Sequence, residues 1–161
     1  MSARLRVLVM TTTAALTVAG VRLADAEPPV TPVRVQEAWV AAAPAVSRVT
    51  AGYLRIENGS DREQVLVGAQ SPLFARVEIH RSELRDGVAR MVPVERLAIR
   101  PGETLAFEPG GYHLMLLDAR APLTAGASVP LSLEWADGGR TELSATVRPP
   151  GGPAHGHRHE H

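Results

Sequence analysis

The sequence contains no cysteine, and this absence limits both its stability and its chemistry. Without thiols the chain can form no disulfide, so an exported domain would depend on its hydrophobic core alone. A binding site for a soft metal ion would have to use Met and His, because no thiolate is available as a ligand. The chain also has no thiol that could be oxidised in an oxidising compartment.

An excess of positive charge is missing as well. The chain has 17 basic and 17 acidic residues, with a formal net charge of +0 at pH 7. A nucleic-acid-binding surface needs clustered excess positive charge. The composition therefore argues against a nucleic-acid partner.

The first 26 residues have the pattern of an export signal. Arg4 and Arg6 precede a mainly apolar stretch over residues 7–21, and Ala24-Asp25-Ala26 supplies the small-x-small cleavage pattern. The alternative is an uncleaved anchor, but the stretch is short and Thr-rich compared with the roughly 20 apolar residues of a membrane span. We predict a signal peptide over residues 1–26 and no membrane span after its removal.

Alternation of apolar and polar residues dominates the rest of the chain, and no window shows a sustained helical period. Turns that contain Gly, Pro, Asn or Asp separate most of the alternating runs. Many short strands at this spacing predict an all-β fold, either an antiparallel sandwich or a barrel. The predicted strands cover residues 33–40, 51–57, 64–69, 76–80, 88–92, 96–99, 104–107, 112–117, 129–135 and 141–147.

This β domain is expected to occupy residues 27–148, and a His-rich tail follows over residues 149–161. The tail has nothing to bury, so we predict that it is disordered. A flexible string of imidazoles can bind Cu(II), Ni(II) or Zn(II), and protonation should weaken that binding below about pH 6.5. The alternatives are a loading site for the main domain, a solubilising tail that binds metal incidentally, and an engineered tag. The imidazoles are those of His155, His157, His159 and His161.

The rare residues of the domain fall close together. Outside the predicted signal, Met occurs only at Met91 and Met115, and outside the tail His occurs only at His80 and His113. Met that merely filled gaps in a core would be scattered along the chain. Residues two apart on a strand share a face, so His113 and Met115 should project together. If Ile79 faces the core, His80 points outward, toward a surface that a partner protein can reach.

Two imidazoles and two thioethers suit Cu(I) best. Thioether sulfur is a soft ligand that selects Cu(I), whereas imidazole also binds Zn and Cu(II). Mg and Ca prefer oxygen ligands, Zn normally recruits Cys, a third His or a carboxylate, and a blue-copper site needs a Cys thiolate. The residues therefore predict Cu(I) storage, buffering or delivery. Taken one by one, each Met could instead be a core residue and each His a surface residue.

The spacing His-x10-Met-x21-His-x-Met, formed by His80, Met91, His113 and Met115, resembles the signature of the periplasmic copper chaperones called PCu(A)C. The resemblance covers roughly residues 33–148. It implies a periplasmic, cupredoxin-like Greek-key β-sandwich that holds one Cu(I) with those four residues. Flanking words that match the family lie at residues 51–58, 77–80, 91–94 and 109–116.

The resemblance also implies a role in supplying copper to the Cu(A) centre of cytochrome c oxidase. The implied partners are the Cu(A)-bearing oxidase subunit and a Sco-type thioredoxin-fold copper protein. Many family members carry Met directly after the first His, but here the residue is Arg81, so an auxiliary thioether is missing.

Three alternatives to delivery stay open at this point. The first is a copper buffering or resistance protein, and the second is a structural sandwich that binds no metal. The third is an enzyme, which we do not expect. Ser82 lies near His80, but no nucleophile-elbow motif surrounds it.

Overall fold

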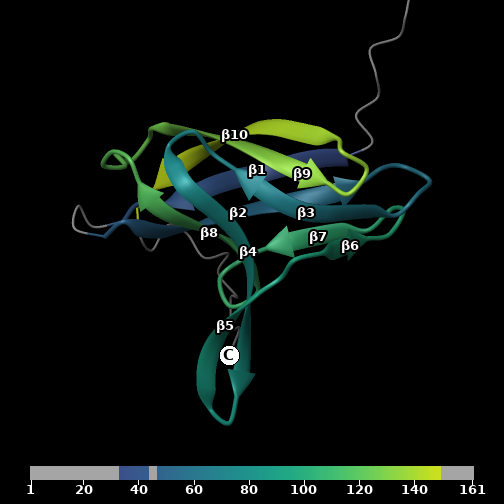
Figure 1. The fold of residues 1–161 in the computed structure, drawn as a ribbon, viewed down its shortest axis with the longest axis horizontal. Coiled ribbons are helices and arrows are strands. Elements are labelled where there is room, and N and C mark those ends of the chain that lie inside the picture. Colours follow the sequence, from purple (N-terminus) through teal and green to yellow (C-terminus); the bar gives the residue numbers. More distant parts are fainter. Residues whose placement is uncertain (1–32, 44–46, 150–161) are drawn as a thin grey trace, which may run out of the picture. The chain divides into compact units, whose positions relative to one another are not determined.

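The computed structural model describes residues 33–43 and 47–149, which form ten β-strands and no helix (Figure 1). The predicted all-β class is confirmed, and each predicted alternating run coincides with one strand. The predicted signal and all but the first residue of the predicted tail lie outside the described residues. The strands are β1 (Val33–Ala41), β2 (Val49–Asn58), β3 (Gln64–Gln70), β4 (Phe74–Arg85), β5 (Val88–Pro93), β6 (Leu97–Ile99), β7 (Thr104–Phe107), β8 (Tyr112–Ala119), β9 (Ser128–Trp135) and β10 (Arg140–Arg148).

The ten strands form one continuous sheet, in the order β5-β4-β8-β7-β2-β1-β10-β9-β3-β6. The sheet closes on itself because β3 also pairs with β4, where Ala69 lies opposite Val77. Two of its pairings, β1 with β10 and β7 with β8, are parallel. The resemblance predicts an antiparallel Greek-key sandwich, and the structure corrects this to a mixed, closed barrel of eight strands, with β5 and β6 attached outside the ring.

Alternate side chains of the barrel strands form a single hydrophobic core. On β8, Leu114 and Leu116 are completely buried, and Ile79 of β4 is also a core residue. Burial of a Leu or Ile side chain stabilises the fold by roughly 1.5–3 kcal/mol. Because neighbouring residues of a strand face opposite sides of the sheet, these core positions direct His113 and Met115 to the outer face of the barrel.

The second half of β4 and all of β5 form a hairpin that projects from the barrel (Figure 1). The sequence predicts a strand that ends at His80, but β4 continues to Arg85. Its last residues leave the core and are held in the strand by their pairing with β5. The turn at Asp86 and Gly87 has positive φ at both residues, as a tight two-residue hairpin turn requires. Every residue of β5 is exposed. Among the described residues, no helix has the length and apolar character needed to cross a membrane.

Candidate metal centre

The pairing of β4 with β8 places the two domain histidines opposite each other. His80 and His113 are register partners, and the centroids of their rings lie 5.9 Å apart. The next residues on this face, Glu78 and Met115, are also register partners. The pairing of β4 with β8 therefore brings together His80 and His113, which are 33 positions apart in the sequence.

Both rings lie on the outer face of the barrel and are nevertheless shielded from solvent. His80 is 8% exposed and His113 is 4% exposed. The turn between β7 and β8 folds against the hairpin, where the Gly111 carbonyl accepts a hydrogen bond from the Ser82 backbone N–H at 3.0 Å. Gly110 in this turn has a φ of 85°, which glycine adopts readily. The predicted outward direction of His80 is correct, but its ring is not open to solvent.

Each imidazole uses one nitrogen for a hydrogen bond within the protein. Nε2 of His80 lies 2.9 Å from a carboxylate oxygen of Glu78, and Nδ1 of His113 lies 3.2 Å from the Gly111 carbonyl oxygen. Because an ionised carboxylate and a carbonyl only accept hydrogen bonds, these two ring nitrogens must carry the protons. In the neutral rings the other nitrogens then have free lone pairs.

Those other nitrogens, Nδ1 of His80 and Nε2 of His113, are buried and have no hydrogen-bond partner among the described residues. An unsatisfied buried acceptor costs about 1–3 kcal/mol, so such groups are rare unless they have a function. A metal ion accepts the lone pair of an imidazole whose second nitrogen is hydrogen-bonded to a carboxylate or a carbonyl. The two imidazoles therefore fit the ligand role predicted for them.

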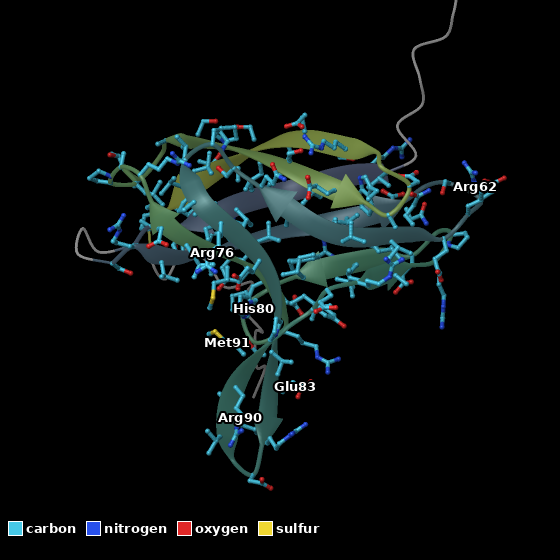
Figure 2. The ribbon with its side chains drawn as sticks, viewed as in Figure 1. Arg62, Arg76, His80, Glu83, Arg90 and Met91 are labelled. Carbon is cyan, nitrogen blue, oxygen red and sulfur yellow. The ribbon has the colours of Figure 1, made fainter. Side chains whose placement is uncertain are left out.

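Both methionines line a pocket with His113, whereas His80 is not among the residues that line it. Met91, Met115 and His113 line one pocket of about 250 Å³, which Tyr53 and Ser82 also line. Met91 is 59% exposed on the hairpin, whereas Met115 is partly buried on β8. Figure 2 shows Met91 close to His80, where the hairpin leaves the barrel.

The pocket offers neutral ligands. Within residues 33–43 and 47–149, no three His, Asp or Glu side chains gather in a way that could hold a metal ion. A site at this position would therefore draw on thioether sulfur. Burial raises the pKa of the Tyr53 phenol above its ordinary value, so this pocket residue stays protonated and uncharged at neutral pH.

Arg81 occupies the position at which many family members carry an additional Met. Its side chain is on the opposite face of β4 from His80, where it pairs with Glu83 and lies 5.9 Å from the centre of the Tyr112 ring. A hydrogen bond to Glu83 raises the pKa of Arg81, and the Arg81 guanidinium lowers the pKa of Glu83. In this geometry a side chain at position 81 contributes nothing to the pocket.

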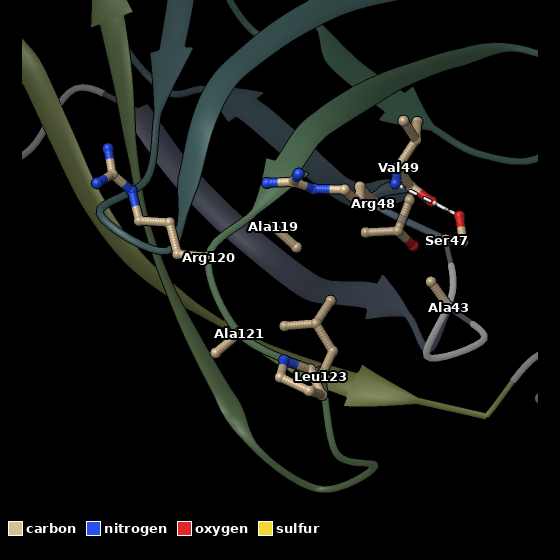
Figure 3. Close-up of a pocket in the computed structure, with 10 residues that line it drawn as sticks. Ala43, Ser47, Arg48, Val49, Ala119, Arg120, Ala121 and Leu123 are labelled. Carbon is tan, nitrogen blue, oxygen red and sulfur yellow. Dashed lines mark hydrogen bonds between the residues drawn. The ribbon is translucent and has the colours of Figure 1, made fainter.

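A larger pocket, of about 480 Å³, contains none of the four candidate ligands (Figure 3). Its lining mixes apolar and polar residues and includes Arg48, which pairs with Asp118 at 3.9 Å, and Arg120. It shares Val49 and Thr50 with the smaller pocket. The donor atoms, and not the size of the cavity, therefore distinguish the candidate metal centre.

The sequence does not identify the partners of the two imidazoles, which are Glu78 and Gly111. Both stand two residues before the His that they contact, so strand alternation gives a signal for Glu78, which shares a face with His80. Alternation gives no such signal for Gly111, because every residue type has a backbone carbonyl and the sequence therefore cannot identify the one that accepts this hydrogen bond.

Residues 33–147 match the family model described as "Putative lipoprotein LpqE-like". Among curated proteins, "Putative lipoprotein Lxx21020" from Leifsonia xyli subsp. xyli (strain CTCB07) is 32% identical over 117 residues. The match covers 72% of this chain and 69% of that protein. The family model spans nearly all of the described residues.

Solved structures extend the comparison. The solution structure of apo-DR1885 from Deinococcus radiodurans has a TM-score of 0.60 and 33% identity, and the match covers 89% of this chain and 97% of that chain. The Cu(I) form of DR1885 has a TM-score of 0.53 and 32% identity, over 77% and 81%. The copper-bound PCuAC domain from PmoF2, at 21% identity and a TM-score of 0.63 over 74% and 94%, shows the shared fold. The resemblance seen in the sequence is thus confirmed, and the chain belongs to the LpqE-like/PCuAC family.

Proposed function

We propose that this chain is a periplasmic copper chaperone that holds Cu(I) with His80, Met91, His113 and Met115. The observation that carries the proposal is the pair of buried imidazole nitrogens without a partner in the described protein. Soft thioether ligands next to two imidazoles select Cu(I) over harder ions. The existence of a Cu(I) form of DR1885 supports the same cargo.

The different exposure of the ligands suggests how the cargo is released. Met91 is 59% exposed, whereas His80 and His113 are almost fully buried. An incoming ligand of an acceptor can therefore replace Met91 first, while the imidazoles still hold the ion. Since thioethers and neutral imidazoles carry no charge, departure of Cu(I) leaves no anionic ligand in the pocket.

We further propose that the acceptor is the Cu(A)-bearing subunit of cytochrome c oxidase, and that a Sco-type protein takes part in the same assembly. Export by the predicted signal peptide would bring the chain to the compartment in which that centre is assembled. The His-rich tail is proposed to bind a second ion, as Cu(II). If Cu(I) binds but does not pass to the oxidase subunit, a copper buffering or resistance role is favoured.

The direct test is Cu(I) affinity, measured anaerobically by competition with a Cu(I) chelator. The wild-type chain should retain one tightly bound Cu(I), and the Met91→Leu/Met115→Leu double variant should fold but lose that binding. Val92→Leu is the matched control, because Val92 lies on the opposite face of β5 from Met91. Wild-type affinity in the double variant would refute the proposed site.

Delivery needs a separate experiment. The Cu(I)-loaded chain is mixed with a purified oxidase subunit whose Cu(A) site is empty. A second equivalent of copper is then added as Cu(II), which supplies the oxidising equivalent of the mixed-valence centre, and the spectrum of that centre is followed. A chain with His113→Leu serves as the control. Absence of transfer from a fully loaded wild-type chain would contradict the chaperone role and leave the copper site intact.

A further inference from the structure

Three side chains on one face of β4 form a chain of contacts that ends at the candidate metal centre. Arg76, Glu78 and His80 are spaced two residues apart, so they share a face of the strand. Nη1 of Arg76 lies 3.4 Å from Oε1 of Glu78, and Oε2 of Glu78 lies 2.9 Å from Nε2 of His80. Each oxygen of the carboxylate thus has its own partner.

The Glu78 carboxylate determines which nitrogen of His80 is free. The Glu78 side chain is only 38% exposed, and it accepts a hydrogen bond from Nε2–H of His80. The proton of the neutral ring is therefore on Nε2, and the buried Nδ1 keeps its lone pair. In His113 the arrangement is reversed, because Nδ1 is bound to the Gly111 carbonyl and Nε2 is free. The two rings therefore leave different nitrogens free, Nδ1 in His80 and Nε2 in His113.

We propose that Glu78, held by Arg76, is the positioning residue of the copper site, and that Cu(I) binds Nδ1 of His80 and Nε2 of His113. This inference rests on the proposed function. A carboxylate behind a ligating imidazole fixes the ring and increases the donor strength of its free nitrogen. Glu78 thus orients the His80 ring through this hydrogen bond without binding the ion itself.

Substitutions at Glu78 separate its hydrogen bond from its charge. Glu78→Leu removes the acceptor, and the affinity for Cu(I) should fall by roughly 10- to 100-fold. Glu78→Gln keeps an oxygen that accepts the same hydrogen bond, so it should recover most of that loss. Glu142→Leu is the matched control, because Glu142 lies on β10, which does not pair with β4. Glu142 also accepts a hydrogen bond through its carboxylate, from the Ser132 hydroxyl at 2.7 Å. The affinity for Cu(I) should not change in this variant.

Nitrogen-15 NMR of the copper-free full chain gives a readout that needs no bound metal. His80 should show a protonated, slowly exchanging Nε2–H and an unprotonated Nδ1, and the slow exchange should disappear in Glu78→Leu. A wild-type His80 ring protonated at Nδ1 would overturn the inference, and this spectrum decides the matter even if Glu78→Leu does not fold.

The outcomes also separate this inference from the proposed function. A wild-type chain that binds no Cu(I) refutes the proposed function, while the copper-free spectrum still tests the role of Glu78. Wild-type Cu(I) affinity in folded Glu78→Leu would overturn the positioning role and leave copper binding intact. Equal losses of Cu(I) affinity in Glu78→Gln and Glu78→Leu would show that the charge of Glu78 matters and its hydrogen bond does not. That result would also overturn the positioning role.

Discussion

Replacement of His113 by Leu should stabilise the copper-free protein. The wild-type ring buries Nε2 without a hydrogen-bond partner in the described part of the chain, which costs about 1–3 kcal/mol. The substitution also removes the Nδ1 hydrogen bond to Gly111, worth about 0.5–1.5 kcal/mol. The Gly111 carbonyl is not left unsatisfied, because it still accepts the Ser82 N–H. The net gain should be about 1 kcal/mol, the difference between the midpoints of these ranges.

Copper should reverse this order of stability. A ligand that binds only the folded state adds RT ln(1 + [L]/Kd), which is about 2.7 kcal/mol when free Cu(I) is 100-fold above Kd. The wild-type chain should gain this amount, whereas His113→Leu, which lacks one imidazole, should gain almost nothing. The variant is therefore the more stable form without copper and the less stable form with it.

Urea unfolding followed by circular dichroism measures both free energies, with chelator present or with buffered Cu(I). Met115→Leu is the control, because it keeps both imidazoles and nearly conserves volume, so copper-free stability should change by less than about 1.5 kcal/mol. A copper-free His113→Leu protein that is clearly less stable than wild type would contradict this prediction, since the buried nitrogen would then carry no penalty.

Four further predictions follow from particular residues. Met91→Leu should change the free energy of unfolding by less than about 0.5 kcal/mol, as is usual for exposed positions, yet weaken Cu(I) binding in chelator competition; unchanged affinity would exclude Met91 as a ligand. Asn58→Ala should lower the free energy of unfolding by at least about 2 kcal/mol, because the buried amide donates to two backbone carbonyls; a wild-type urea midpoint would contradict this. Since burial raises the pKa of Tyr53 above 10.0, the unfolded chain releases that proton first, and stability should fall as pH rises through about 10; Tyr53→Phe should remove this part of the dependence. A chain that ends at Arg148 should lose Cu(II) in equilibrium dialysis and keep Cu(I), and equal Cu(II) binding with and without the tail would exclude the tail site.

The local pattern of the sequence was sufficient to predict the strands and part of the site. Alternation gave the ten strands and put His113 and Met115 on the face opposite Leu114. The rarity of His and Met identified the residues that the structure then brings together. These features are local, because side-chain direction along a strand depends only on its period of two residues.

The remaining features depend on contacts between residues distant in the sequence. The parallel pairing of β1 with β10 joins the two ends of the domain, and the short pairing of β3 with β4, with Ala69 opposite Val77, closes the barrel. Nothing in the alternation of one strand specifies such pairings. The burial of His80 likewise depends on the register of β4 against β8 and on the turn at Gly111.

The decisive measurement is X-ray absorption spectroscopy at the copper edge of the full chain loaded with one equivalent of Cu(I), because it identifies the atoms that bind the ion. The spectrum should show both sulfur and imidazole nitrogen in the first coordination sphere of the ion, and the sulfur signal should be lost in the Met91→Leu/Met115→Leu variant. A sphere of nitrogen and oxygen alone in the wild-type chain would contradict the account, because the bound copper would then lie outside the pocket that His113, Met91 and Met115 line.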